Sequence, residues 1–233
     1  MSAQQALKQH YIPLTSLTSR ANDIAAGDAA NDSKIRDSIV RMVMGYLSTD
    51  TLLCWAPPRS SHDAESIIES KTDAPTQRKS LREVQMETAL PIISFLTTKV
   101  WPGIELNPVL EENSIMPTPQ PEQTTQVIRG WIASLPAFEL AGLERGVLAS
   151  KSLLIATRLL CEGSEEFKSL RHDADQGAKF GIEEAAKACT LEVTWQTDMW
   201  GEVEDTHDVD KEDVRRQFGS VILLVQNGKT ATA

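Results

Sequence analysis

The residue types best suited to chemistry or binding gather in one stretch near the C-terminus, Leu191–Arg216. Two tryptophans, Trp195 and Trp200, precede a run of carboxylates in which Lys211 is the only base. The acids of this run are Glu202, Glu204, Asp205, Asp208, Asp210, Glu212 and Asp213. Aromatic side chains beside charges are common anchors of protein interfaces, whereas carboxylates beside a histidine can also hold a metal ion. The stretch therefore predicts a binding site of one of these two kinds.

The acid run divides into two parts. Acids from Asp208 onward begin a predicted helix, where carboxylates complement the helix dipole. Glu202, Glu204 and Asp205 follow the preceding predicted helix, where each carboxylate costs roughly 0.3–1 kcal/mol. Charges kept where they cost stability suggest a role in docking a basic or donor-rich partner, with Trp200 as the aromatic anchor. A plain solvated corner is the structural alternative.

A divalent metal site is the alternative function for this stretch. Glu204, His207 and Asp208 offer ligands of suitable type, so a metal-dependent enzyme or a metal-binding protein is a second hypothesis. The segment from Asp208 begins with the acid spacing of a calcium loop. It lacks the central glycine and the final bidentate glutamate that such a loop needs. The sequence thus excludes an EF-hand but leaves a simpler cation site open.

Other catalytic motifs are missing from the sequence. Gly146–Ser152 superficially resembles a phosphate-binding loop, but it lacks the second glycine and falls within a predicted helix. There is no G-x-G-x-x-G or G-x-S-x-G pattern, and the four histidines are scattered. The three cysteines, Cys54, Cys161 and Cys189, have no metal-ligand spacing and lie in apolar surroundings. We expect a protein that is not an enzyme, with no cofactor and no nucleotide of its own.

The charge balance restricts the partners. The chain of 233 residues has 23 basic and 33 acidic side chains, a formal net charge of −10. A nucleic-acid binder needs a basic stripe to neutralise phosphates, and no such stripe is present. No apolar run reaches the roughly 20 residues that span a bilayer, so we expect no membrane insertion. These features favour a protein as the partner.

Hydrophobic periodicity predicts a mainly α fold, an orthogonal helical bundle with a minor β element. Short strands are expected near 52–55 and 103–106, where brief apolar runs end at proline or glycine. The longest helix is predicted from Ala137 to about Glu162, with Gly142 and Gly146 on one face for a close helix crossing. Another helix with one buried face is predicted from Ile182 to Trp200, and Gly201 marks the joint after it. We divide the chain into an N-terminal helical segment, 1–50, and a bundle domain, 51–228. The bundle carries a loop or disordered insertion at 59–79, and a frayed tail follows at 229–233.

Four segments of the sequence resemble a known family, the mitochondrial assembly chaperones of the F-type ATP synthase that bind its alpha subunit (assembly factor 2 type). These segments are Ile12–Leu17, Leu53–Pro57, Trp131–Leu140 and Trp195–Asp208, and they occur in the family's order. The resemblance covers nearly the whole chain apart from the 59–79 loop and the last residues. Family members usually carry a β-rich domain and a transit peptide before the first segment, and on this resemblance both are lacking here.

The resemblance implies a non-catalytic, ATP-independent chaperone of the mitochondrial matrix. Such a protein binds the unassembled alpha subunit, prevents its aggregation and is displaced by the beta subunit as the catalytic head assembles. Carried over residue by residue, it implies a partner-binding site at Trp200, Glu202, Glu204 and Asp205, with His207 and Asp208 as neighbours. The strands near 52–55 and 103–106 would then pack with the β-rich domain.

Overall fold

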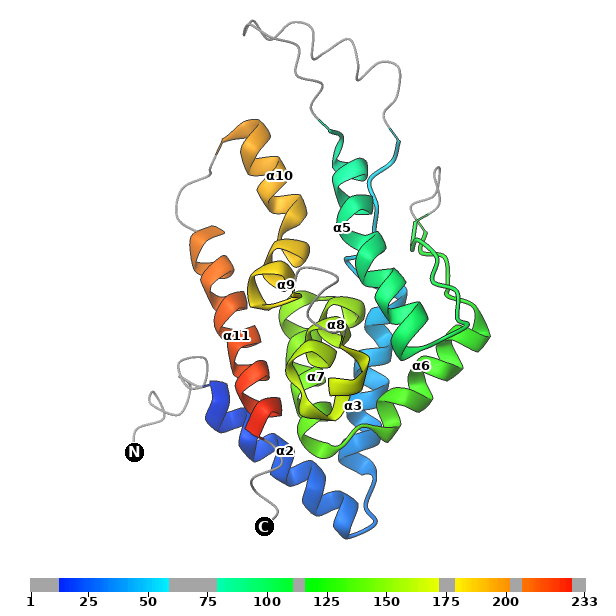
Figure 1. Ribbon diagram of the computed structural model, residues 1–233, viewed down its shortest axis with the longest axis vertical. Coiled ribbons are helices and arrows are strands. Elements are labelled where there is room, and N and C mark those ends of the chain that lie inside the picture. Colours follow the sequence, from blue (N-terminus) through cyan, green and yellow to red (C-terminus); the bar gives the residue numbers. More distant parts are fainter. Residues whose placement is uncertain (1–12, 59–78, 111–115, 172–178, 202–206, 228–233) are drawn as a thin grey trace, which may run out of the picture.

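The fold is built from helices around one hydrophobic core (Figure 1). A computed structural model describes residues 13–58, 79–110, 116–171, 179–201 and 207–227. Its elements are α2 (Pro13–Ala29), α3 (Lys34–Gly45), η2 (Tyr46–Thr49), α5 (Leu81–Phe95), η3 (Leu96–Val100), α6 (Glu122–Ser134), α7 (Ala137–Ser150), α8 (Leu153–Gly163), η4 (Glu165–Leu170), α9 (Ile182–Cys189), α10 (Leu191–Trp200) and α11 (His207–Asn227). The predicted mainly α fold is confirmed. Within the described ranges, no helix is both long and apolar enough to cross a membrane.

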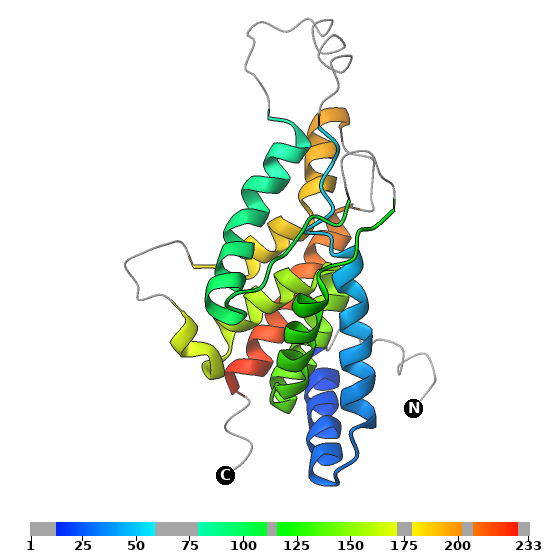
Figure 2. The same cartoon turned by 90° about the vertical axis from the view of Figure 1, so that its right-hand side faces the viewer.

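Helix α7 is the centre of the bundle. It contacts α2, α3, α8 and α11, and Leu140, Ala141, Leu143 and Val147 are fully buried along it. Helix α2 runs diagonally across one end of the molecule, while α5 and α10 project at the opposite end (Figures 1 and 2). The apolar side chains of α2 and α3 belong to the same core cluster as those of α7 and α8.

Close helix crossings at α7 depend on its two glycines. A Cβ atom added at Gly142 would lie 3.0 Å from Val225 Cγ1 of α11, and one at Gly146 would lie 3.0 Å from Ala156 Cβ of α8. Each glycine therefore lets a neighbouring helix approach the α7 backbone. This contact offsets the roughly 1 kcal/mol that a helix-interior glycine costs relative to alanine, and the predicted close crossing is confirmed.

The predicted long helix Ala137–Glu162 is wrong, because the chain breaks into α7 and α8. Lys151 ends α7 in the left-handed region, with φ 59° and ψ 22°. The Ser150 hydroxyl bonds to both Gly146 O and Ser152 O, at 2.8 and 2.9 Å. Ser152 then caps α8 by accepting from Ile155 N–H at 3.0 Å. The apolar pattern continues in phase through this joint, so the break is hidden from periodicity.

A buried carboxylate holds the joint in place. Asp50 is fully buried, and its two oxygens accept the N–H groups of Leu52, at 3.0 Å, and Leu154, at 3.1 Å. It thereby satisfies a second unpaired donor in the first turn of α8, next to the one that Ser152 takes. The turn after α3 is in this way attached to the start of α8.

The two predicted strands near 52–55 and 103–106 are also wrong. The N–H groups of Leu53 and Cys54 donate to Asp50 O at 2.9 and 3.2 Å, which closes a turn instead of extending a strand. Within the described ranges 50–58 and 103–110, one backbone hydrogen bond joins the segments, from Val109 N–H to Leu53 O at 2.9 Å. Pro57, Pro58 and Pro108 supply no N–H donors, so a ladder cannot extend from this contact. The described residues contain no strand.

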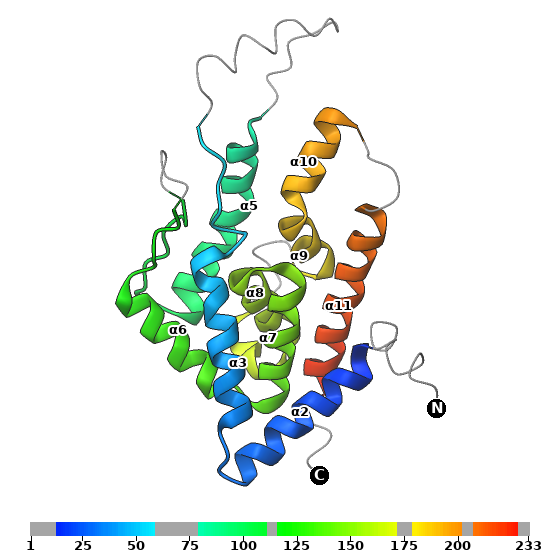
Figure 3. The same cartoon turned by 180° about the vertical axis from the view of Figure 1, so that it is seen from behind.

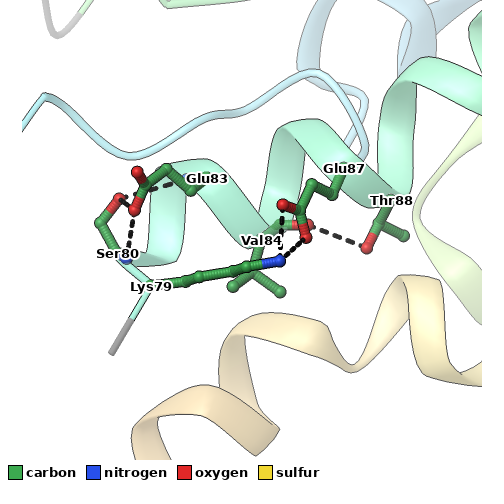
Figure 4. Close-up of polar contacts among 6 residues, drawn as sticks. All are labelled: Lys79, Ser80, Glu83, Val84, Glu87 and Thr88. Atoms are coloured by element: carbon green, nitrogen blue, oxygen red, sulfur yellow. Dashed lines mark hydrogen bonds and ion pairs between the residues drawn. The ribbon is translucent and has the colours of Figure 1, made fainter. Parts of the chain in front are cut away.

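Helix α5 begins with a capping box (Figure 4). Ser80 Oγ accepts from Glu83 N–H at 3.3 Å, and the Glu83 carboxylate accepts from Ser80 N–H at 2.6 Å. Lys79 extends back along the helix, and its Nζ donates to both oxygens of Glu87 at 2.7 Å. Pro91 does not end the helix, which continues to Phe95. The start of α5 is thus fixed at the projecting end of the molecule.

Candidate partner-binding site

In the sequence, the acid run predicted as the site lies between the end of α10, which is at the projecting end of the molecule (Figure 3), and the first turns of α11. Glu202, Glu204 and Asp205 lie outside the described residues. Trp200 is the last residue of α10, and His207 and Asp208 begin α11. The structure describes the backbone of these three residues and not their side chains. The site assignment therefore stays a prediction, and the helices on either side of it carry the structural argument.

Gly201 forms the joint that the sequence predicted. Its φ is 88° and its ψ is 163°, a backbone conformation that residues with a Cβ atom rarely adopt. Its N–H donates to Thr197 O at 2.8 Å, which terminates α10. A glycine at this point allows the chain to leave the helix sharply before the acids.

Helix α10 lies outside the hydrophobic core. The sequence predicted one buried helix face from Ile182 to Trp200, but the chain breaks at Thr190 into α9 and α10. Ala185 and Ala186 of α9 are buried, whereas none of the α10 side chains that the structure describes is buried. The predicted burial is therefore wrong beyond α9, because α10 contacts mainly α5 and α9 and its described side chains stay at least partly exposed.

Apolar side chains of α10 face solvent as a result. Val193 is 36% exposed and Met199 is 37% exposed, while Leu191 and Trp195 are half-buried. A helix with apolar residues distributed round its surface is typical of a buried position. An apolar helix covered on one side only is typical of a protein-binding surface.

The described acids of α11 are neutralised within the helix bundle. Glu212 pairs with Arg215 at 2.9 Å, and Asp213 pairs with Arg216 at 3.4 Å. Arg215 also binds Glu183 of α9 at 3.1 Å, and this hydrogen bond raises the pKa of the Arg215 guanidinium. The acids at 212 and 213 thus have structural partners, which agrees with treating the C-terminal half of the acid run as part of a helix start.

No metal or phosphate site forms from the described residues. Within them, no group of three His, Cys, Asp or Glu side chains is arranged to hold a metal ion, and Glu204 of the alternative site lies outside them. Gly146 of the supposed phosphate loop packs against Ala156, and Lys151 Nζ lies 6.0 Å from the Tyr46 ring centre. This segment is a helix joint, so it has no exposed backbone N–H cradle for a phosphate.

The three thiols are unsuited to nucleophilic chemistry. Burial raises the pKa of Cys161 to about 12 and that of Cys189 to about 11. Burial also raises the pKa of Cys54, with a smaller contribution from the carboxylates of Asp50 and Glu192. Because the thiolate is the reactive form, these shifts lower the reactivity of the three thiols at neutral pH.

We expect Cys161 and Cys189 to react with iodoacetamide at pH 8 at least 100-fold more slowly in the native chain than in the urea-unfolded chain, on the order of the change in thiolate fraction. Raising a thiol pKa by two units or more lowers the thiolate fraction by this factor. Mass spectrometry of quenched time points gives the rate at each cysteine. Equal native and unfolded rates at either position would contradict the assignment of low reactivity to these thiols.

Comparison with known proteins finds relatives in one family. Residues 1–97 match the family described as ATP12 chaperone protein. The chain is 28% identical over 219 residues to the mitochondrial protein atp12 of Schizosaccharomyces pombe, covering 94% of this chain and 62% of the relative. It is 30% identical over 233 residues to the mitochondrial protein ATP12 of Saccharomyces cerevisiae, covering 94% and 65%. The chain thus spans less than two thirds of the length of these relatives.

Solved structures show the same fold. The crystal structure of Atp12 from Paracoccus denitrificans superposes with a TM-score of 0.57 at 18% identity, covering 88% of this chain and 69% of that one. A point mutant of the P. denitrificans protein gives a TM-score of 0.58 with the same identity and coverage. At this identity the structures support the fold alone, and the sequence matches carry the family resemblance. The chain is similar in sequence to proteins of the ATP12 chaperone family.

Proposed function

We propose that this chain is an assembly chaperone for the catalytic head of the mitochondrial F-type ATP synthase. It binds the unassembled alpha subunit, prevents its aggregation and releases it when the beta subunit takes its place. Similarity to the ATP12 chaperone family supports this role. The structural observation that carries the proposal is α10, an apolar helix outside the core that leads directly into the acid run.

Helix α10 and the acid run combine the two features that a chaperone interface needs. Half-buried and exposed apolar side chains on α10 supply area that a partner can remove from water. The carboxylates of Glu202, Glu204 and Asp205 select a basic or donor-rich surface and repel acidic ones. Trp200 is the proposed anchor that precedes these carboxylates in the sequence, and His207 and Asp208 follow them. The same positions were assigned from the family resemblance.

The proposed activity makes and breaks no covalent bond. The chaperone covers apolar surface on the free alpha subunit. Fewer alpha subunits with this surface exposed are then present, so the alpha subunit self-associates more slowly. No ATP is needed for this step, because binding and displacement are driven by competition between two protein surfaces. The nucleotide site belongs to the alpha subunit itself. The relatives are named as mitochondrial proteins, and we propose the matrix as the place of action because the catalytic head assembles there.

Reversing the charge at Glu202 and Glu204 tests the site. We expect the Glu202→Lys, Glu204→Lys double variant to recover about tenfold less alpha subunit in a pull-down from cells that co-express both proteins. The physical reason is that two attractive interactions with a basic surface become repulsive. Alpha-subunit solubility in the same cells should fall in parallel.

Glu105→Lys is the matched control, because Glu105 is an exposed acid remote in sequence from the site. It should leave both pull-down and solubility unchanged. Circular dichroism of each variant checks that the helices are intact. A folded double variant with wild-type recovery of the alpha subunit would refute the site assignment. Failure of the wild-type chain to raise alpha-subunit solubility would refute the proposed function.

A further inference from the structure

A groove lies between α5 and α10 at the projecting end of the molecule. It has a volume of about 320 Å³, at the small end of the range of ligand sites, roughly 300–1,000 Å³. Its apolar lining comes from Val84 of α5 and from Leu191 and Trp195 of α10. Thr194 lies beside them and is exposed. This space suits one or two apolar side chains of an extended segment.

The two helices run in opposite directions along the groove. The N-terminal end of α5 and the C-terminal end of α10 both lie at the outer end of the molecule (Figures 1 and 2). Lys79 and Asp198 therefore line the groove near its outer end, and Lys187 of α9 lines it near the start of α10. The outer end continues through Gly201 into the acid run, so the groove and the proposed acid site are contiguous in the chain.

The charges along the groove are unequal. Lys79 is neutralised by Glu87, to which it donates two hydrogen bonds of 2.7 Å (Figure 4). Lys187 is exposed and makes no salt bridge or side-chain hydrogen bond with any residue that the structure describes. Backbone hydrogen bonds at the α9 cap lower the pKa of the Glu184 carboxyl, and the charge of Lys187 adds to this effect. An ammonium without a salt-bridge partner beside an apolar floor attracts a carboxylate that is attached to an apolar group.

Lys187 places a positive charge on the groove of a chain whose formal net charge is −10. The overall field repels acidic partners, while the acid run at 202–205 attracts basic ones. At the inner end of the groove, Lys187 instead favours an acidic group of the partner. A partner segment that fits must therefore carry its carboxylate at a defined place relative to its apolar residue.

We propose that the groove between α5 and α10 binds an extended segment of the client protein in which an apolar residue is flanked by an aspartate or glutamate. The apolar side chain lies against Val84, Leu191 and Trp195, and the carboxylate pairs with Lys187. This inference rests on the proposed function for the identity of the client, and it adds a second point of contact with a different charge preference. Two contacts on one client raise its affinity without requiring either to be strong.

Site-specific crosslinking tests the groove. A benzophenone amino acid replaces Thr194 in the full chain, and in a control chain it replaces Lys99, an exposed residue of η3 at the opposite end of α5. The probes are synthetic 15-residue peptides that tile the alpha-subunit sequence. We expect crosslinks from position 194 to peptides with an apolar residue next to an acid, and none to the same peptides from position 99.

Charge reversal at the inner end provides the second readout. Lys187→Glu should lower the affinity for the crosslinking peptides about fivefold, measured by fluorescence anisotropy, because a surface ion pair becomes a repulsion. Lys99→Glu makes the same change of charge on the exposed surface of η3 and should leave the affinity unchanged. Replacing the acid of the peptide by lysine should weaken binding to the wild-type chain by a similar factor.

The outcomes separate this inference from the proposed function. Absence of any peptide crosslink from position 194, crosslinks within the chain itself, or an affinity insensitive to Lys187→Glu would each overturn the groove assignment. Protection of the alpha subunit from aggregation, measured on the same proteins, tests the proposed function separately from the groove. Loss of protection alongside intact peptide crosslinking would refute the alpha-subunit role and leave the acidic-apolar specificity of the groove established.

Discussion

The Gly146→Leu variant is expected to lose about 3 kcal/mol of unfolding free energy or more. A Cβ atom at this position would already lie 3.0 Å from Ala156 Cβ and 3.6 Å from Ala156 Cα. Both neighbours are close to the α8 backbone, so the clash cannot be relieved by rotating a side chain. A leucine adds three further carbon atoms and forces α7 and α8 apart at the centre of the core. Urea denaturation at pH 7.5 measures the change as a shift of midpoint at constant slope.

Gly130→Leu is the matched control for this prediction. Gly130 is also a helix-interior glycine, but it lies on the exposed face of α6 and a Cβ there meets nothing within 4 Å. The same substitution should stabilise the chain by roughly 0.5–1 kcal/mol, because leucine has the higher helix propensity. Equal effects at the two positions would show that the α7–α8 crossing does not depend on the missing side chain at Gly146.

The glycine spacing on α7 illustrates what the sequence can predict. Glycines four residues apart in an otherwise apolar helical pattern indicate a close crossing, because nothing else offsets their cost. The structure confirms the crossing and adds which helices take part. Gly142 contacts α11 and Gly146 contacts α8, and this division depends on tertiary packing that the local pattern does not contain.

The break between α7 and α8 illustrates what the sequence hides. The apolar stripe continues through Lys151, and Lys151 itself has ordinary helix propensity. The break is stabilised from a distant part of the chain, because the Asp50 carboxylate accepts Leu154 N–H across 104 residues of sequence. Thr51 adds two more contacts, from its N–H to Lys151 O at 3.3 Å and from its hydroxyl to Ser150 O at 3.2 Å. A signal was present in Ser150 and Ser152, since serine favours helix caps over helix interiors.

The same turn accounts for the wrong strand near 52–55. A short apolar run ending at two prolines fits a strand when only its own residues are considered. In the structure Asp50 organises this run as a turn, and Trp55 Nε1 donates to Leu52 O at 2.9 Å. Side-chain to backbone bonds of this kind compete with a strand ladder, and aspartate is well suited to form them.

The candidate site was predicted from the energetic cost of its carboxylates and from the residue types around them. The exposure of the neighbouring helix became visible only in the structure. The placement of Glu202, Glu204 and Asp205 after a predicted helix pointed to a functional charge cluster. The sequence also predicted that α10 would bury one face, and its apolar residues gave no sign that its described side chains stay at least partly exposed. The exposed position of α10 follows from the break at Thr190, and it is this exposure that makes the end of the molecule a plausible interface.

The Asp50→Ala variant is expected to lose about 3 kcal/mol of unfolding free energy at pH 7.5. Alanine removes the acceptor of two buried N–H groups, those of Leu52 and Leu154, and water has no access to replace it. The loss should appear as a lower urea midpoint together with faster amide exchange in the first turn of α8. Asp50→Asn keeps the size of the side chain but offers one carbonyl acceptor in place of two, so it should lose less than the alanine variant.

The stability lost in the Asp50→Ala variant is expected to become smaller as the pH rises. Burial raises the pKa of Asp50 from 3.8 to about 6, against the opposing effect of its hydrogen bonds to Ser152 and to backbone N–H groups. A carboxyl whose pKa is higher in the folded chain stabilises the fold most below the unfolded pKa, and this contribution is lost as the pH rises through 6. The stability difference between wild type and Asp50→Ala should therefore shrink by about 2 kcal/mol from pH 4 to pH 8. A difference that stays constant, or that grows with pH, would show that Asp50 is ionised in the folded chain throughout this range.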